Sequence, residues 1–181
     1  MFIHCYDIEH KSKAQMKQVL LENLAHYLQK PASSIKIKRN KNGKPQVDGL
    51  YFSISHCRDK LVQVFSENAE IGIDIEFKNK QRNYLKLAKR FFPVQEFNFL
   101  QQLNTKDAIN MFYQLWTCKE AYCKYFGGVL WQYLADNFLD NNNQLRKNKG
   151  DVYFKALPIL PDFAMQIATT QKALCEDIIY V

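Results

Sequence analysis

Three acidic side chains, at two places in the sequence, are of the type that binds a divalent cation. Asp74 and Glu76 alternate with isoleucines in IGIDIEF, and Glu120 lies in WTCKEAYCKYFGG. Side chains alternate across a strand, so Asp74 and Glu76 are expected on one face. A hard cation such as Mg²⁺ prefers oxygen ligands, and Glu120 would strengthen such a site as a third carboxylate. A half-exposed edge strand whose acidic face meets water explains the spacing of the pair equally well.

Basic residues that could bind phosphate gather in the loop IKIKRNKNGKP. Five lysines and arginines lie between Lys36 and Lys44, among them Arg39, and Gly43 would let the backbone approach an anion. The simpler interpretation is a solvated loop. His56, directly after the strand-like YFSIS, could donate to a phosphate, although a lone histidine is more often structural. Nucleic acid is not favoured as a ligand, because no aromatics are interleaved with the charges and no binding motif accompanies them.

Glu120 belongs to a long helix that the sequence predicts. Asn104 or Thr105 can cap this helix, which runs to Phe126 and is closed by the two glycines that follow. Glu120 and Lys124 stand four residues apart and share one face of the helix. A solvent-exposed ion pair would be the simplest reason for that spacing.

The other predicted elements place these residues in two halves. We predict strands at 2–8, 50–55, 61–66, 70–77, 151–157, 163–169 and 174–180, a helix that begins at Ser12 and ends before Pro31, and shorter helices at 83–91 and 94–103. The turn-like HCRDK and NNNQ separate strands. Each half starts with a strand, passes into a helix and ends in antiparallel-looking strands. We therefore expect one α+β unit made of halves 1–69 and 70–181.

Composition and charge narrow the class of protein. The chain has 181 residues, 47% of them hydrophobic, and a net charge of +7, which suits a compact domain with an acidic partner. The five cysteines show no C-x-x-C spacing, so neither a zinc ribbon nor a disulfide framework is indicated. The first residues do not resemble a signal peptide, and no apolar run reaches the length of a membrane span. A cytoplasmic protein that does not insert into membranes is expected.

Five segments taken in order resemble one enzyme family. RNKNGKP, FSISHC, IGIDIE, KRFFPVQEF and FYQLWTCKEAYCKYFGG are similar in order and spacing to the 4′-phosphopantetheinyl transferases of the surfactin-synthetase-activating type. The resemblance runs from Arg39 to about Gly128, and more faintly through FAMQIAT. That family combines G-I-D-x-E, R-F-F-x-x-x-E and W-x-x-K-E-[AS]-x-x-K. The resemblance implies transfer of the phosphopantetheine arm of coenzyme A to a serine of an acyl or peptidyl carrier protein, with release of 3′,5′-ADP.

The resemblance also implies roles for single residues. Asp74, Glu76 and Glu120 would bind Mg²⁺, Ser55, His56 and Lys124 would bind or adjoin the phosphates, and Arg39 and Lys44 would contact coenzyme A at its nucleotide end. Glu120 and Lys124 would be the catalytic pair, with Glu120 accepting the serine proton directly or through a water. One candidate role for Lys119 is to neutralise the departing diphosphate.

Two features of the chain bear on this resemblance. The family pattern N-x-S-H-S appears here as Ser53-Ile54-Ser55-His56-Cys57, and a thiol is a weaker donor than a hydroxyl. A non-catalytic module that binds coenzyme A or a carrier protein is therefore the alternative. The resemblance further implies two fused, similar halves, each with antiparallel strands on a long helix, that act as a monomeric pseudodimer. Its partners would be coenzyme A and an acidic carrier protein, bound in the cleft between the halves.

Overall fold

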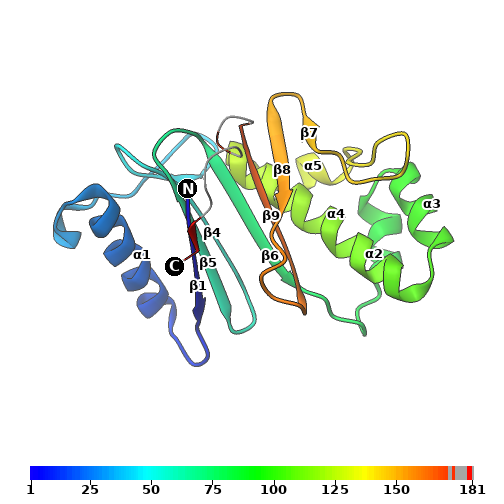
Figure 1. Cartoon of the computed structure of the whole chain (residues 1–181), viewed down its shortest axis with the longest axis horizontal. Helices are drawn as coiled ribbons and strands as arrows, with labels where there is room; N and C mark the ends of the chain where they lie inside the picture. Colours follow the sequence, from blue (N-terminus) through cyan, green and yellow to red (C-terminus); the bar gives the residue numbers. More distant parts are fainter. Residues whose placement is uncertain (171–172, 174–178, 181) are drawn as a thin grey trace.

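Two sheets form the centre of the molecule (Figure 1), and each contains four strands among the described residues. The computed structural model describes residues 1–170, 173, 179 and 180. The first sheet has the order β10-β1-β5-β4, with β1 Phe2–Asp7, β4 Tyr51–Cys57, β5 Lys60–Ser66 and β10 Ile179–Tyr180. The second has the order β6-β9-β8-β7, with β6 Ile71–Phe77, β7 Asn148–Lys149, β8 Val152–Ala156 and β9 Phe163–Thr170. Apart from the parallel β1–β10 contact, neighbouring strands are antiparallel, so the predicted α+β class is confirmed.

Helix α1 (Lys13–Leu28) packs against the first sheet. Its start is the predicted capping box: Ser12 Oγ accepts from the Gln15 amide at 3.3 Å, and the Gln15 side chain accepts from the Ser12 amide at 2.8 Å. Leu24 of this helix is fully buried and belongs to a core cluster with Phe65 of β5. Burial of this apolar stripe fixes α1 beside the strands that follow it.

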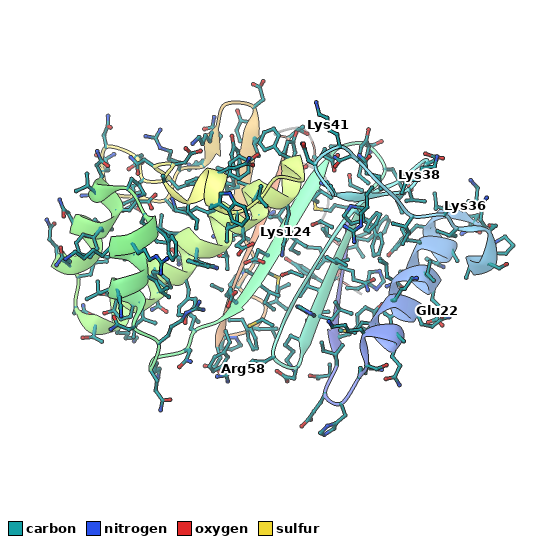
Figure 2. The ribbon with its side chains drawn as sticks, turned by 180° about the vertical axis from the view of Figure 1, so that it is seen from behind. Glu22, Lys36, Lys38, Lys41, Arg58 and Lys124 are labelled. Atoms are coloured by element: carbon teal, nitrogen blue, oxygen red, sulfur yellow. The ribbon has the colours of Figure 1, made fainter. Side chains whose placement is uncertain are left out.

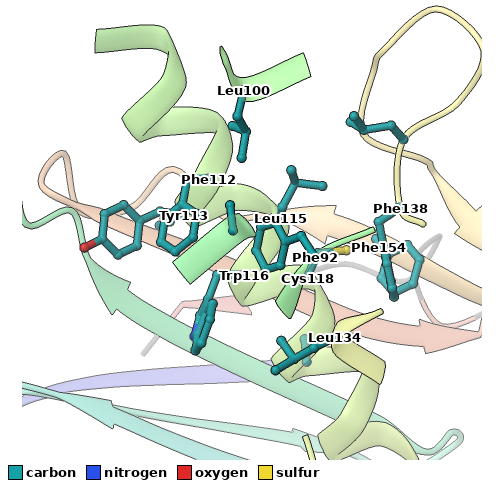
Figure 3. Packing of buried hydrophobic residues seen from close by; sticks show 14 of the residues in the cluster. Phe92, Leu100, Phe112, Tyr113, Leu115, Trp116, Cys118, Leu134, Phe138 and Phe154 are labelled. Carbon is teal, nitrogen blue, oxygen red and sulfur yellow. The ribbon is translucent and has the colours of Figure 1, made fainter. Parts of the chain in front are cut away.

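Helix α4 (Thr105–Phe126) lies across one face of the second sheet, and helices α2 (Tyr84–Phe91) and α3 (Val94–Gln102) pack against α4 (Figure 1). Figure 3 shows the aromatic core that they enclose, in which the rings of Phe92 and Phe112 stack with centroids 5.4 Å apart. Helix α4 starts at the predicted Asn104 cap and ends at Gly127, whose φ of 74° is left-handed.

Strand β6 lies where the two sheets meet, and both of its faces are buried. The isoleucines Ile71, Ile73 and Ile75 form a core cluster with residues of the first sheet that include Val62. The other face lies against α4. A Cβ at Gly72 would come within 2.1 Å of a backbone oxygen of that helix, so only glycine permits this close approach. Over the residues that the structure describes, β6 is an outer strand of its sheet, but Asp74 is buried, so the half-exposed strand with an acidic face in water considered from the sequence is wrong.

Several predicted boundaries need correction. Strand β4 continues through Cys57 and β5 begins at Lys60, so the turn is shorter than HCRDK. The basic loop contains a small hairpin, β2 (Lys38–Arg39) with β3 (Pro45–Gln46), after the 3₁₀ turn η1 (Ala32–Ser34). The short helix α5 (Trp131–Leu134) was not predicted. Most of the strand predicted at 174–180 lies outside the described residues, apart from β10. Within the described part of the chain, no helix combines the length with the hydropathy that a membrane span requires.

Candidate functional site

A cavity of about 690 Å³ lies between β4, β6, α1 and α4. Its lining includes seven of the residues singled out from the sequence, namely Arg39, Ser55, His56, Asp74, Glu76, Glu120 and Lys124. Alternation along β6 directs Asp74 and Glu76 away from the isoleucine core and toward α4. Helical spacing brings Glu120 and Lys124 to the same side of α4. The fold therefore brings together the three acids and the lysine that were predicted to act together.

Asp74 is the most buried acid of the cavity, with 3% of its surface exposed. Its Oδ1 accepts from Lys124 Nζ at 2.7 Å and from Ser55 Oγ at 2.8 Å, and Lys124 also donates to Ser55 Oγ at 2.8 Å. Burial raises the pKa of Asp74, whereas the Lys124 charge opposes that rise. Asp74 Oδ2 is buried and accepts no hydrogen bond from the described residues, which leaves this oxygen available to a ligand.

The three carboxylates influence one another. Burial, followed by the charge of Asp74, raises the pKa of Glu120 to about 7, and Glu76 adds to that rise. Burial and Asp74 raise the pKa of Glu76 in the same way. A cation bound among these groups would relieve both the repulsion and the cost of burial.

Carboxylate oxygens are the ligand type that Mg²⁺ prefers, but the three carboxylates do not converge on one point at which a cation would bind. Among the described residues, no group of three or more His, Cys, Asp or Glu side chains is placed to hold a metal ion. Asp74 instead has the Lys124 ammonium beside it. The oxygen donors and the unpartnered Asp74 Oδ2 fit a hard cation. The structure thus brings the predicted ligands to one cavity without assembling the predicted magnesium site.

A second cavity of about 320 Å³ adjoins the first. Arg39, Ile54 and Lys124 line both cavities, so the two form neighbouring parts of one cleft. Arg39 is exposed on β2 and its guanidinium donates to the carbonyl of Gly43 at 2.6 Å. Together the cavities offer a long binding region with acids at one end and an arginine near the middle.

Lys44 lies at the edge of the second cavity, but its ammonium is held inside the protein. Nζ donates to Glu70 Oε1 at 2.6 Å, to the Ile71 carbonyl at 2.7 Å and to the Tyr125 carbonyl at 3.0 Å. An ammonium has three donors, so these bonds use all of them. Burial lowers the pKa of Lys44, while the bond and the charge of Glu70 oppose that change. As placed, Lys44 ties the hairpin to β6 and α4 and has no N–H left for a phosphate.

The remaining loop lysines are on the surface. Figure 2 shows Lys36, Lys38 and Lys41 along one edge of the molecule, while Lys124 lies toward its middle. The Lys38 ammonium is 3.1 Å from a carboxylate oxygen of Asp48. The solvated loop considered from the sequence describes these three side chains well.

Lys119 does not reach the cleft, so the suggested role at a departing diphosphate is wrong for this structure. The side chain is fully buried, 2.9 Å from Glu96 Oε2, and it also donates to Glu96 Oε1 at 3.2 Å and to the Asp136 carbonyl. Glu96 Oε1 accepts the Phe138 amide at 2.6 Å. Sequence reasoning gave Glu96 no role, although it is the final residue of the R-F-F-x-x-x-E segment and the one charged residue between Arg90 and Lys106.

Comparisons with known proteins agree on one family. The model of the 4′-phosphopantetheinyl transferase superfamily matches residues 70–168. The 4′-phosphopantetheinyl transferase Sfp of Bacillus subtilis (strain 168) is 30% identical over 191 residues, which cover 98% of this chain and 84% of that protein. HetI of Nostoc sp., also named a 4′-phosphopantetheinyl transferase, is 31% identical over 129 residues, or 67% of this chain and 54% of that protein. The 4′-phosphopantetheinyl transferase gsp of Aneurinibacillus migulanus is 29% identical over 143 residues, or 78% and 59%. The chain thus spans little more than half the length of HetI and gsp.

Proposed function

Because the chain belongs to the 4′-phosphopantetheinyl transferase superfamily, we propose that it transfers the 4′-phosphopantetheine group of coenzyme A to a serine of an acyl or peptidyl carrier protein. The transfer releases 3′,5′-ADP. One observation carries the proposal: Asp74, Glu76, Glu120 and Lys124 line a single cavity together with Ser55 and His56. Phosphoryl chemistry needs such a set, because charge develops on the transferred group and on the leaving group.

We propose that Asp74, Glu76 and Glu120 hold Mg²⁺ in this cavity. When bound, the cation would stabilise negative charge on the diphosphate oxygens. Glu120 accepts the proton of the attacking serine, directly or through a water. Lys124 uses two of its three donors on Ser55 and Asp74, which leaves one N–H for a phosphate oxygen. His56 is exposed at the same cavity and offers a further donor.

The neighbouring cavity accommodates the nucleotide end of coenzyme A in this proposal. Arg39 lines both cavities and provides a planar cation for a phosphate between them. Lys44 contributes indirectly, by holding the hairpin wall against Glu70. Gly43, whose φ of 86° favours glycine, lines this wall and lets the backbone approach the ligand.

We further propose the surfactin-synthetase-activating type, with halves 1–69 and 70–181 acting as a monomeric pseudodimer in the cytoplasm. The match to Sfp over 98% of this chain supports the type. The two four-stranded sheets support two halves, although β10, at residues 179 and 180, pairs with β1 of the first sheet. The net charge of +7 supports an acidic carrier protein as the partner.

Intact-protein mass spectrometry tests the reaction. An apo carrier protein is incubated with this protein, coenzyme A and Mg²⁺, and a gain of one phosphopantetheine that disappears with EDTA is expected. Asp74→Asn should abolish the gain, whereas the matched change Asp48→Asn, at an exposed turn residue after β3, should preserve it. Binding of coenzyme A without transfer to several carrier proteins would refute the proposal and favour a non-catalytic binding module.

A further inference from the structure

Strands β4 and β6 lie side by side at the junction of the two sheets, yet side chains join them instead of a backbone ladder. The Ile73 amide donates to Ser53 Oγ at 3.1 Å, the Ile75 amide to Ser55 Oγ at 3.4 Å, and the Phe77 amide to Cys57 Sγ at 3.3 Å. In all three pairs the β6 residue comes 20 positions after its β4 partner, so residue numbers increase in the same direction along both strands and the strands are parallel. Each is the outer strand of its own sheet among the described residues.

Two of these three β4 side chains also contact the acid that precedes the amide they bind. Ser55 Oγ donates to Asp74 Oδ1 at 2.8 Å, and Cys57 Sγ donates to Glu76 Oε2 at 3.6 Å. A hydroxyl or thiol can do both, because it carries one donor and also accepts. Ser53 has no such contact, since the preceding residue of β6 is Gly72.

We propose that Ser55 and Cys57 are positioning residues for the carboxylates of β6. The oxygen or sulfur of each side chain accepts a hydrogen bond from a β6 amide, which fixes the register of β6 against β4. The hydroxyl or thiol hydrogen is donated to the neighbouring carboxylate, which fixes the orientation of that carboxylate. Asp74 and Glu76 are thereby held facing Glu120 across the cavity. Second-layer contacts of this kind orient metal ligands and tune their affinity. This inference rests on the proposed function for the cation, and on the hydrogen bonds described above for the contact between β4 and β6.

These short-range contacts to β6 also explain why the β4 residues that make them have small side chains. Ser53, Ser55 and Cys57 are small, and the first two are at most 8% exposed. A larger side chain at these positions would push β6 away from β4. Cys57 stands where the resembling family has serine, yet it keeps both contacts, at 3.3 Å from the Phe77 amide and 3.6 Å from Glu76 Oε2. A thiol is a weaker donor and acceptor than a hydroxyl, so both bonds are weaker than those of a serine.

The test compares Cys57→Ala with three controls. Cys57→Ser keeps a donor and an acceptor, Ser53→Ala removes an amide contact but no carboxylate contact, and Cys5→Ala removes a thiol that packs on the same core cluster from β1. Two quantities are measured on the whole chain: Mn²⁺ affinity by electron paramagnetic resonance, and amide hydrogen exchange at Ile73 and Phe77.

We expect Cys57→Ala to weaken Mn²⁺ binding about tenfold and to speed exchange at Phe77 about fivefold. Cys57→Ser should stay within about twofold of the unmodified protein or bind more tightly. Ser53→Ala should speed exchange at Ile73 without the loss of Mn²⁺ affinity, and Cys5→Ala should change neither quantity. Unchanged Mn²⁺ affinity in Cys57→Ala, or an equal loss in Ser53→Ala, would overturn the positioning role. If the unmodified protein binds no Mn²⁺, the metal assignment fails. Amide exchange at Phe77 in Cys57→Ala still decides whether Cys57 holds the Phe77 amide.

Discussion

Replacing Lys119 by methionine should remove stability and leave the cleft intact. The ammonium is fully buried against Glu96 and lies 4.8 Å from the ring centroid of Phe92 and 4.7 Å from that of Phe138. Methionine has a similar length and fills most of the same space, so the substitution mainly removes the charge. The carboxylate of Glu96 is then left buried without the ammonium that lies against it, and the Lys149 charge is the smaller of the two cationic effects on it.

The size of the effect follows from that unpaired charge. Removing one partner of a buried ion pair costs about 3–5 kcal/mol, a large share of the total of about 5–15 kcal/mol for a typical domain. Adding Glu96→Gln to Lys119→Met should recover about 2 kcal/mol or more, because a neutral amide is cheaper to bury than a carboxylate. The glutamine Oε1 can still accept the Phe138 amide.

Urea unfolding and coenzyme A calorimetry separate a structural role from a catalytic one. Lys119→Met should lower the free energy of unfolding by the stated amount while the folded protein binds coenzyme A normally. The control Lys86→Met, on the exposed side of α2, should stay within about 0.5 kcal/mol. A loss below about 1 kcal/mol together with weakened coenzyme A binding would refute this reasoning and return Lys119 to the diphosphate.

Two further predictions concern the scaffold. Gly72→Ala should lower the free energy of unfolding in urea by at least about 3 kcal/mol, because its Cβ would meet the Ala121 carbonyl. The control Gly150→Ala, in open space at φ 60°, should lower it by about 1 kcal/mol, and equal losses in the two variants would contradict the close approach of β6 and α4. Burial lowers the pKa of His4, which is bonded to Tyr27, below its ordinary 6.5, so the contribution of His4 to stability should fall as pH drops through about 6.5. Glu120, with its pKa raised to about 7, contributes the opposite slope in this window. The His4 contribution is therefore read as the difference between the unmodified protein and His4→Gln in unfolding measured between pH 5 and 8, and two parallel curves would contradict it.

The sequence predicted the long elements well because their ends carry local signals. Ser12 and Gln15 form the expected capping box, and Asn104 and Gly127 bound α4 as expected. Helix α5 was missed because its four residues carry no side-chain cap and span too little chain for a period to show. Local chemistry therefore located the helices that hold the site.

Burial was the part that local patterns could not supply. Alternation showed that Asp74 shares a face with Glu76, but it could not show that α4 covers that face and leaves Asp74 only 3% exposed. From the sequence, Lys44 and Lys119 were interpreted as cations that bind phosphates. Their ammonium groups are in fact bound by distant segments of the chain, which only the tertiary packing brings near them. The resemblance identified the motif positions without separating those that build the walls from those that face the cleft.

The three motif lysines differ in how many N–H groups the protein already uses. Lys44 donates three hydrogen bonds within the chain, and Lys119 donates two and also lies 2.9 Å from the second carboxylate oxygen of Glu96. Both side chains are at most 5% exposed. Lys124 donates two hydrogen bonds, and its side chain is 29% exposed at the cavity. An ammonium whose N–H groups are all engaged within the protein holds the segments that form the cleft together. An ammonium with one N–H free can bind a substrate oxygen on which negative charge develops. Chemistry in this cleft should therefore depend on Lys124, whereas Lys44 and Lys119 keep the strands and helices in place around it.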